Sequence, residues 1–552
     1  MRCLRGRDWV VLAAIFIVLL QATGTAPRSN ENPRSVIVQG EDLEAAADAV
    51  RAVGGNLTHE LRVINAVAAR MDKNDVARIK SIDGVKLFVD EVLEVNAPKQ
   101  KPGGQITGQE THAATLVGAD ALHTEGITGE GVAIAFIDTY APGFYDFPGL
   151  FYDTNGKVRG STLHYASNDP EAFVDHGHST HLMSIAASSL ITNEGKYNGI
   201  APDARLVLLN AFRSDGSSRY SDVIAAIEWV IENSQYESIS ASGVKTRLRV
   251  LNLSFSALPR SHYWDDPLNQ AVMRAWQAGL VVVTSAGNRG PDAMTVGVPG
   301  NVPYVITAGA MTDSYTPEVV TDDQLASFSS TGPTVEGFVK PDIVAPGGHI
   351  RATMAKSSVL AGDHREFFDR KGYFTMSGTS QSTALVSGIV ALMLQHDPQL
   401  TPDDVKCRLM ASARPAVADD GDLAYSIFQQ GAGMVNAYDA VYGDECGCAN
   451  RGLDIELDLA GTMHFGGSAN RDENGNYYIE GLDGYMWSDG YMWSDGYMWS
   501  DAYMWSDAYM WSDAYMWSDA YMWSDAYMWS DAYMWSDGLT ETMSINVWVP
   551  QQ

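Results

Sequence analysis

Short apolar runs separated by helical patterns dominate the middle of the chain. Val132–Ile137 is an unbroken apolar run that ends at Asp138, and similar short runs recur further along the sequence, at 206–209, 250–253, 280–283 and 304–307. Unbroken runs of this kind are typical of strands buried on both faces of a parallel sheet. Helical patterns at 221–232 and 267–278 lie between the runs. The alternation predicts an α/β fold with a doubly wound, mostly parallel sheet.

A smaller α+β pattern precedes this region. It contains strand-like segments and two helical segments, and we expect the second helix to be capped by Asn74. In chain order we expect a strand at 35–38, a helix at 43–53, a strand at 65–71, a helix at 74–81 and a closing strand at 85–95. The Pro- and Gly-rich segment 97–104 that follows predicts a linker.

The first 26 residues are typical of a secretion signal. Arg2, Arg5 and Arg7 form a basic start, and Trp9–Leu20 is an apolar run of 12 residues followed by small residues at 24–26. This run is shorter than the roughly 20 residues that span a bilayer. A signal anchor is the alternative. Since no later apolar run is longer, we expect no stable membrane span after signal removal and a protein that is secreted or held at the cell surface after bacterial-type export.

The composition limits the possible binding partners and separates the C-terminal repeats from the rest of the chain. The net charge is −31, which argues against binding to nucleic acid, whose phosphates would repel such a surface. Nine hexads of Tyr-Met-Trp-Ser-Asp-Gly/Ala fill residues 485–538. The hexads predict stacked strands or a β-solenoid that could contact a cell surface or glycans through Trp faces, whereas the alternative is a flexible, acidic tail.

Three cysteines remain after the signal, at 407, 446 and 448. In an exported protein we expect one disulfide from Cys407 to either Cys446 or Cys448, with one thiol left over. Metal binding by the three is the less favoured alternative.

One stretch, 374–394, carries the first candidate for chemistry. Gly378 allows a sharp turn, Thr379 and Ser380 are typical of a helix start, and apolar residues then recur at helical spacing. An ordinary helix cap is the structural alternative. A serine nucleophile needs an imidazole base, which His178 can supply, and a carboxylate that orients the imidazole, which Asp138 can supply. Asn288 follows an apolar strand and could donate its amide hydrogen to a developing oxyanion.

Residues 175–187 also hold three histidines, at 176, 178 and 181. They could bind zinc, but no glutamate lies among them as a helical zinc-protease motif would require. We therefore expect no metal in the site. We expect His176 to face solvent.

Over about 112–442 the chain resembles the subtilisin-like serine proteases. The resemblance rests on the order Asp138…His178…Ser380 and on nine motifs that occur in the family's order. The motifs are Ala-Phe-Ile-Asp-Thr at 135–139, His-Ser-Thr-His at 178–181, Asn-Gly-Ile-Ala-Pro at 198–202, Asn-Leu-Ser-Phe-Ser at 252–256, Ser-Ala-Gly-Asn at 285–288, Val-Pro-Gly-Asn-Val-Pro-Tyr-Val-Ile at 298–306, Ala-Ser-Phe-Ser-Ser-Thr-Gly at 326–332, Lys-Pro-Asp-Ile-Val-Ala-Pro-Gly at 340–347 and Ser-Gly-Thr-Ser at 377–380.

The resemblance implies a fold, a domain order and a substrate site. The fold is a three-layer α/β sandwich, and the N-terminal unit resembles the family's inhibitory propeptide. The implied order is a signal at 1–26, a propeptide at 35–96, a linker with the self-cleavage site at 97–111, a catalytic domain at 112–445, a Cys-containing connector at 446–484, the repeats at 485–538 and a final segment at 539–552. Substrate peptides would add as a strand along two segments. These segments are Ser254, Phe255 and Ser256, and Ser285, Ala286 and Gly287.

The resemblance further implies a secreted endopeptidase that acts on proteins or peptides, with its own propeptide as an intramolecular inhibitor. It also implies that His178 is the base and that His181 is a second, structural histidine. No cofactor is required for the chemistry, and a structural Ca²⁺ is an open alternative at loop 191–197. The chain departs from the family pattern at Tyr140, Ser179, Gln381 and Ala384, and Ser256 replaces a usual glycine and narrows the pocket. These departures leave one functional alternative, an inactive subtilase-like scaffold that binds surfaces through its aromatic repeats.

Overall fold

The computed structural model describes most of the chain between residues 33 and 479. The described residues are 33–95, 113–141, 150, 152–156, 162–165, 173–192, 194–234, 237–239, 245–314, 322–369, 372–418, 422–473, 475–479 and 503–504. The signal at 1–26, the linker at 97–111, the final segment at 539–552 and all of the hexads except two residues lie outside this part.

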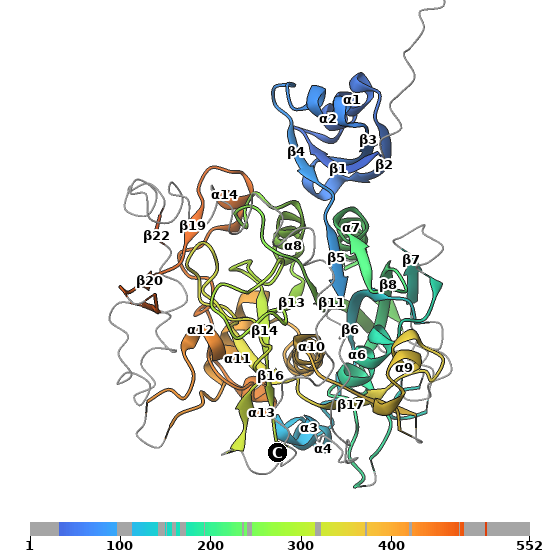
Figure 1. The fold of residues 1–552 in the computed structure, drawn as a ribbon. Coiled ribbons are helices and arrows are strands. Elements are labelled where there is room, and N and C mark those ends of the chain that lie inside the picture. The colour runs from blue at the N-terminus through green and yellow to red at the C-terminus, as the bar shows by residue number, and fades with distance from the viewer. Residues whose placement is uncertain are drawn as a thin grey trace, which may run out of the picture.

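A nine-stranded, mostly parallel sheet forms the centre of the larger domain (Figure 1). Its main path runs β15-β14-β13-β11-β6-β8-β7, with β10 paired to β11 and β16 to β14. The pairs along β7, β8, β6, β11, β13, β14 and β16 are parallel, whereas β10 and β15 pair antiparallel. The strand bounds are β6 Val132–Thr139, β7 Thr162–Tyr165, β8 Arg205–Phe212, β10 Glu237–Ile239, β11 Lys245–Leu253, β13 Val281–Ser285, β14 Ile306–Thr312, β15 Gln324–Leu325 and β16 Ile343–Pro346.

Helices cover both faces of this sheet. On one face lie α6 (His178–Ala187) and α10 (Thr379–His396), which also pack against each other. On the other lie α7 (Tyr220–Ser234) and α8 (Pro267–Gln277). The described part of the chain thus confirms the predicted three-layer α/β sandwich. The apolar strand residues lose contact with water on both faces, which accounts for their unbroken apolar runs.

The smaller N-terminal unit is a four-stranded sheet, in the order β2-β3-β1-β4, covered by two helices (Figure 1, blue). Its elements are β1 Arg34–Gln39, α1 Leu43–Val53, β2 Asn56–Leu61, β3 Ala66–Met71, α2 Lys73–Ile79 and β4 Lys86–Val89. Two expectations were wrong here. Asp72, and not Asn74, caps α2, because its carboxylate accepts the backbone N–H groups of residues 74 and 75. The closing strand is broken after Val89, and β5 (Val92–Val95) leaves the unit and runs into the larger domain (Figure 1).

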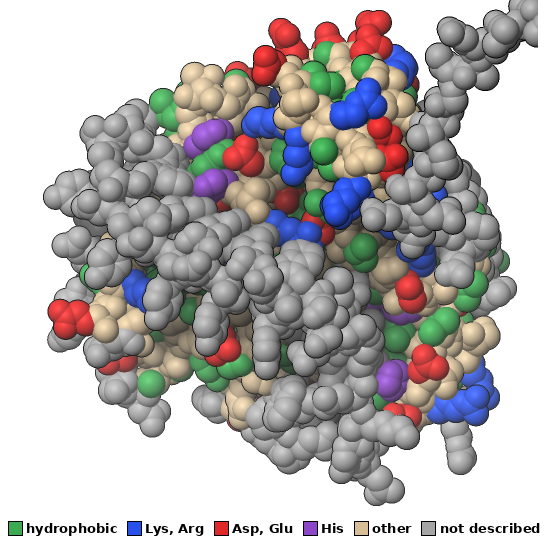
Figure 2. Space-filling view, turned by 45° about the horizontal axis from the view of Figure 1, so that its top comes forward, with side chains coloured by type: hydrophobic (Ala, Val, Ile, Leu, Met, Phe, Trp, Pro, Cys, Tyr) green, Lys and Arg blue, Asp and Glu red, His purple; other side chains and the backbone are tan. Residues whose placement is uncertain are grey.

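Charged and polar contacts join the N-terminal unit to the larger domain. Asp90 is buried and its carboxylate accepts both the backbone N–H and the hydroxyl of Ser221, at 2.9 Å each, in the first turn of α7. Arg260 pairs with Glu91, and Lys86 pairs with Asp265 at 3.1 Å. Lys and Arg side chains gather where the two units meet (Figure 2). A carboxylate at the N-terminus of α7 also interacts favourably with the helix dipole.

Smaller elements complete the larger domain. They are α3 Ala113–Leu116, α4 Ala119–Thr124, β9 Ser217–Arg219, β12 Phe255–Ser256, β17 Ile350–Thr353, α9 Val359–Asp363, β18 Tyr373–Met376, α11 Pro402–Ala411, α12 Ile427–Gln430 and α13 Ala437–Tyr442. The pattern of residues 431–441 alone predicts one helix over the whole segment, but α13 begins only at Ala437, so that prediction is wrong for its first half. Gly431 and Gly433 have φ of 58° and 111°, values that interrupt a helix.

The described part of the connector packs on the larger domain. It forms α14 (Ile455–Leu459) and the short strands β19 (Phe465–Gly466), β20 (Ala469–Arg471) and β21 (Tyr477–Ile479). Trp264 is stacked between the rings of His262 and His464, with centroids 4.1 and 4.4 Å away. Asp458 is buried and accepts hydrogen bonds from the hydroxyls of Tyr263 and Tyr304, at 2.6 and 3.1 Å. These contacts fix the connector against the larger domain.

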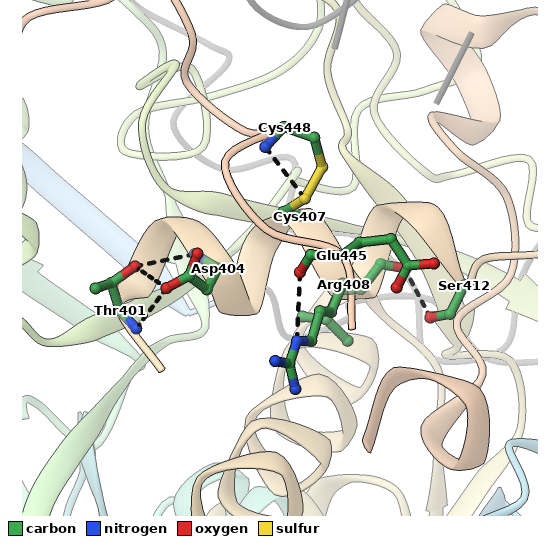
Figure 3. The surroundings of a disulfide bond; sticks show 8 residues. Thr401, Asp404, Cys407, Arg408, Ser412, Glu445 and Cys448 are labelled. Carbon is green, nitrogen blue, oxygen red and sulfur yellow. Dashed lines mark hydrogen bonds between the residues drawn. A yellow bond between two sulfur atoms is a disulfide. The ribbon is translucent and has the colours of Figure 1, made fainter. Parts of the chain in front are cut away.

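A disulfide joins Cys407 on α11 to Cys448, and Cys446 is free and exposed (Figure 3). The expected single disulfide is confirmed, and Cys407 pairs with Cys448 and not with Cys446. Next to it, the buried ammonium of Lys406 donates to the carbonyl of Pro303 at 2.6 Å and to the side chain of Asn450 at 3.2 Å. None of the helices among the described residues is both long and apolar enough to cross a membrane.

Candidate active site

Asp138 and His178 form a buried pair at the carboxyl end of β6. The Nδ1 atom of His178 lies 2.9 Å from each carboxylate oxygen of Asp138, and both side chains are fully buried. Asp138 Oδ1 also accepts the backbone N–H of Thr139 at 2.7 Å. Since β6 pairs with β8 on one side and β11 on the other, the pair lies where the strand order reverses, the usual place for a ligand crevice in such sheets.

His178 is the first residue of α6 and follows Gly177, whose φ is 100°. A Cβ at Gly177 would lie 2.7 Å from the hydroxyl of Ser358, so both the turn and the close packing require glycine. Nδ1 faces Asp138, whereas Nε2 is buried without a hydrogen-bond partner. An Nδ1–H bound to a carboxylate leaves Nε2 as the basic nitrogen of the ring.

Ser380 lies in the first turn of α10, after Gly378. Its hydroxyl is buried and donates to the backbone carbonyl of Ser254 at 3.0 Å, not to His178. The packing of α6 against α10 brings the turns that carry His178 and Ser380 to the same side of the sheet. A hydroxyl at this helix start lies in a field that stabilises negative charge.

Asn288 follows β13 and is nearly fully buried. Its Oδ1 accepts both the backbone N–H of Thr379, at 2.9 Å, and the hydroxyl of Thr379, at 2.8 Å. Because the amide oxygen is bound to Thr379, the amide NH₂ is the group available for a ligand next to Ser380.

Two strands flank β5 in a three-stranded sheet with the order β12-β5-β9. Val95 pairs with Phe255 and Glu94 with Ser256 on β12, while Val92, Leu93 and Glu94 pair with β9. The backbone N–H of Val95 also donates to the carbonyl of Gly216 at 2.8 Å. A segment of the N-terminal unit is thus held as an added strand between two edges of the larger domain.

The predicted substrate segments lie next to each other beside β5. Ser285 donates its hydroxyl to the carbonyl of Phe255 at 3.0 Å, which ties the Ser254–Ser256 segment to the Ser285–Gly287 segment. The hydroxyl of Ser254 accepts the side-chain amide of Asn252 at 2.8 Å. Sequence reasoning missed the second edge, β9, although the Asp-Gly pair at 215–216 that opens it is a recognisable turn signal.

The three histidines of 175–187 have separate environments. His176 is buried, so the expectation that it faces solvent was wrong. A Cβ at Gly216 would lie 3.5 Å from its Nε2 and 2.7 Å from a methyl of Val95, which places His176 beside the added strand. His181 Nε2 lies 3.0 Å from the carbonyl of Phe374.

Burial determines the protonation of the residues around the Asp138–His178 pair. It lowers the pKa of His176 to about 3, helped by the neighbouring His178, and it lowers the pKa of His181 to about 3. Burial also raises the pKa of Asp175 to about 6. At neutral pH both flanking histidines are therefore neutral and add no positive charge next to His178.

Among the described residues, no group of three or more His, Cys, Asp or Glu side chains could hold a metal ion. The described residues of the loop 191–197 do not fit calcium. Lys196 places its ammonium there, 2.8 Å from Asp120, and Glu194 is exposed, so carboxylates do not converge. The described residues of this loop therefore contribute an ion pair, and a structural Ca²⁺ elsewhere in the protein stays a prediction.

The four residues that depart from the subtilisin-like motifs do not disturb the Asp138–His178 pair. Tyr140 packs edge-on against Phe173, with ring centroids 5.9 Å apart. Ser179 adds a hydroxyl 3.3 Å from that of Thr139. Gln381 and Ala384 are buried within α10, and the Gln381 amide has no hydrogen-bond partner.

Comparison with known proteins agrees with this geometry. Residues 129–434 match the model of the subtilase family, peptidase S8. Serine protease AprX of Bacillus subtilis strain 168 is 39% identical over 319 residues, which are 57% of this chain and 67% of AprX. Subtilisin E of the same strain is 28% identical over 368 residues, 66% of this chain and 80% of subtilisin E.

The crystal structure of fervidolysin from Fervidobacterium pennivorans, a keratinolytic enzyme related to subtilisin, superposes with a TM-score of 0.56. It is 20% identical in sequence, and the match covers 75% of this chain and 62% of the fervidolysin chain, so it supports the fold alone. Fold and relatives together define a serine-type peptidase, a hydrolase. The chain belongs to the subtilase family.

Proposed function

We propose that the protein is a secreted serine endopeptidase, made as a zymogen that processes itself. Ser380 is the nucleophile, His178 the general base and then acid, and Asp138 the group that orients His178. Asn288 and the backbone amide of Ser380 bind the oxyanion. The buried pair of Asp138 and His178, with Nε2 left unpartnered, supports these roles.

The reaction proceeds through an acyl-enzyme. Ser380 Oγ attacks the carbonyl carbon of the peptide bond while its proton passes to His178 Nε2. The carbonyl oxygen becomes an oxyanion held by the Asn288 amide, and the imidazolium is stabilised by Asp138. His178 then protonates the leaving amine as the C–N bond breaks. Water, deprotonated by His178, hydrolyses the ester and restores the Ser380 hydroxyl.

Strand addition explains how a substrate activates Ser380. In the present arrangement the Ser380 hydroxyl donates to the Ser254 carbonyl. A peptide strand that extends along β12 brings its own N–H groups to that carbonyl, which releases the hydroxyl to turn toward His178 Nε2. Catalytic hydrogen bonds often form only in the complex with substrate.

The observation that carries the proposal is the register of β5. Because Val95 lies opposite Phe255 and the pairing is antiparallel, β5 runs toward Ser254, whose carbonyl accepts from Ser380 Oγ. We infer that self-cleavage occurs shortly after the end of β5, at the Asn96–Ala97 bond. After cleavage, β5 would remain in place as an inhibitor until the N-terminal unit is released or degraded.

The direction of β5 supports self-cleavage at the bond that joins residue 96 to the expected linker, at the N-terminal edge of the region 97–111 in which self-cleavage was predicted. The secretion signal at 1–26, export to the cell exterior and surface or glycan contact through the repeats belong to the same proposal, but they concern residues outside the described part. Protein or peptide substrates would bind where β5 lies.

A fluorophosphonate probe on the purified protein tests the proposal. We expect labelling of the processed protein, loss of labelling in Ser380→Ala, and a mature N-terminus at Ala97 by N-terminal sequencing. Ser380→Ala should accumulate as the unprocessed chain. A processed protein that neither takes the probe nor cleaves peptides would instead be the inactive surface-binding scaffold.

A further inference from the structure

The loop between β12 and α8, residues 258–266, is held from two sides and is called the shared loop below. It begins shortly after β12, the strand that pairs with β5, and it ends at Asp266, whose carboxylate caps α8. Some of its residues contact the N-terminal unit, and others contact the connector.

The N-terminal unit holds the shared loop through two ion pairs. Arg260 pairs with Glu91, which lies just before β5, and Asp265 pairs with Lys86. The side chains of Arg260 and Glu91 are exposed by only 25% and 14%, whereas Lys86 and Asp265 are exposed by 63% and 39%. Because water and salt screen exposed charges, the contact of Arg260 with Glu91 is the stronger of the two.

A chain of hydrogen bonds joins Trp264 to the same unit. The carbonyl of Trp264 accepts from the side-chain NH₂ of Gln270 at 2.9 Å, and the amide oxygen of Gln270 accepts from the side chain of Gln39 at 2.8 Å. Since Gln39 is the last residue of β1, this chain of bonds ends in the sheet of the N-terminal unit.

The connector holds the middle of the shared loop, residues 262–264. Tyr263 is fully buried and donates its hydroxyl to Asp458, and the ring of His464 covers one face of Trp264. The Nδ1 atom of His464 lies 2.7 Å from a carboxylate oxygen of Asp458, so one carboxylate supports both contacts. Helix α14 of the connector packs against α8, on the side of the larger domain that carries the N-terminal unit (Figure 1).

Glu336 ties the connector and the shared loop to the same point. Its backbone carbonyl accepts the N–H of Gly467 in the connector at 2.7 Å, and its buried carboxylate accepts the N–H of Tyr263 at 3.1 Å. A Cβ at Gly467 would lie 2.1 Å from the carbonyl oxygen of Gly337, so the connector backbone approaches the larger domain here as only glycine allows.

A tight turn couples the two sets of contacts. The backbone N–H groups of Asp265 and Asp266 both donate to the carbonyl of His262, at 3.0 and 3.1 Å. The turn therefore joins a residue that lies in the part held by the connector to the residue that pairs with Lys86. A shift on the connector side of the turn displaces the contacts with the N-terminal unit, because the two are parts of one hydrogen-bonded network.

We propose that the connector takes part in inhibition: it holds the shared loop in the conformation that binds the N-terminal unit, with His464 as a positioning residue. The inference rests on the proposed function, in which the N-terminal unit stays bound as an inhibitor after self-cleavage. Loss of the connector contacts promotes release of the N-terminal unit and so opens the active site. Because coupling between two binding equilibria is reciprocal, release of the N-terminal unit loosens the connector by the same factor.

Hydrogen–deuterium exchange of the full-length Ser380→Ala chain tests the effect of the connector on the N-terminal unit. In this background we expect His464→Ala to raise the exchange rate of the β5 amides by about tenfold, since coupled sites typically affect each other about 5- to 150-fold. Tyr263→Phe removes only the hydroxyl that binds Asp458, so it should raise the rate less, by about two- to fivefold.

Arg471→Ala is the matched control, because Arg471 belongs to the same connector but is exposed and packs on Tyr477 of its own hairpin. It should leave the exchange of β5 within about twofold. The reciprocal experiment compares the mature enzyme, freed of the N-terminal unit, with the Ser380→Ala chain. Exchange of the connector amides at 464–469 should be faster in the mature enzyme, by about the factor that His464→Ala produces in β5.

Unchanged exchange of β5 in His464→Ala, or equal exchange of residues 464–469 in the two forms, would overturn the inference. Probe labelling of Ser380 would in that case leave the proposed function standing. If His464→Ala did not fold, Tyr263→Phe and the reciprocal experiment would still decide the question. A protein that neither processes itself nor takes the probe would overturn the proposed function, and the inhibitory role of the connector with it.

Discussion

The amide oxygen of Asn288 accepts both the backbone N–H and the hydroxyl of Thr379, at 2.9 and 2.8 Å. This contact fixes the direction of the side chain, because the oxygen is held at the start of α10 and the NH₂ is turned to the other side. A donor that is held before the reaction begins needs no reorganisation when charge develops. The same amide therefore links the helix start that carries Ser380 to the proposed oxyanion site.

Asn288→Asp separates the two roles of this side chain. The variant keeps an oxygen for Thr379 but loses the NH₂ donor, so we expect kcat to fall about 10²–10³-fold, or about 2.7–4 kcal/mol, with little change in melting temperature. Steady-state kinetics and calorimetry on the same preparations check this. In Asn288→Ala both kcat and the melting temperature should fall, since Thr379 also loses its partner. A fully active Asn288→Asp enzyme would exclude Asn288 as an oxyanion donor.

Asp90 should dominate the inhibition by the N-terminal unit. Its buried carboxylate accepts two hydrogen bonds from Ser221 and one from the hydroxyl of Ser35 at 2.7 Å. Hydrogen bonds to a charged group contribute roughly 1.5–3 kcal/mol, so Asp90→Ala should weaken inhibition of the mature enzyme about 10- to 100-fold. The inhibition constant of separately produced wild-type and variant N-terminal units measures this.

Lys86→Ala provides the comparison for Asp90→Ala. Lys86 forms an ion pair with Asp265 across the same interface, but both side chains are exposed, by 63% and 39%. Exposed pairs contribute about 0.2–1 kcal/mol, so the inhibition constant should change by less than about fivefold. If both variants weakened inhibition equally, the capping of α7 by Asp90 would not be the main contact.

Asp266 makes the stability of the larger domain depend on pH. It caps α8 through the N–H groups of Leu268 and Asn269, and burial raises its pKa to about 6. In the unfolded chain this carboxyl ionises near its ordinary pKa of 3.8. Between pH 4 and 6 the folded state therefore binds more protons than the unfolded state, and this group's contribution to stability falls as pH rises through that window.

Asp266→Asn removes this dependence while it keeps an oxygen that can cap α8. We expect the melting temperature of the variant, relative to wild type, to be higher at pH 7.5 than at pH 4.5. Calorimetry of both proteins across this range gives the difference directly. A constant difference between the two curves would mean that Asp266 does not change its protonation in the folded protein over this range.

The sequence pattern predicts a helix or strand correctly where the residues of that element alone determine its structure. The helix at 43–53 was predicted to the residue, because its apolar spacing is regular and Gly54 ends it with a φ of 87°. The prediction is wrong where contacts with residues distant in the sequence determine the local structure. Residues 432 and 434 bond to Asp342 and Arg414 instead of continuing a helix, and Asp90 turns out of its strand to reach Ser221.

The same distinction between local sequence pattern and distant contacts applies to the candidate active site. The family motifs predict which segments meet, and the Asp138–His178 contact agrees with the arrangement that they imply. No local signal shows that β5 inserts between β9 and β12, because that pairing joins residues more than a hundred positions apart. The expectation for His176 was wrong for a similar reason, since Gly216, which lies close to its Nε2, is distant from it in the sequence.

The last prediction concerns the disulfide between Cys407 and Cys448, which closes a loop with a sequence separation of 41 (Figure 3). Limiting the unfolded chain in a loop of this size stabilises the fold by roughly 4 kcal/mol in the chain-entropy model. The bridge also holds the segment that brings Asn450 to the buried ammonium of Lys406, which donates to it at 3.2 Å. Cys407→Ala with Cys448→Ala, in a Cys446→Ser background, should therefore lower the free energy of unfolding by about 2–5 kcal/mol in urea titrations. Cys446→Ser alone should leave it unchanged within about 0.5 kcal/mol, because Cys446 is exposed and unbridged. Equal stability of the double variant and its background would show that the bridge adds nothing to the packing around Lys406.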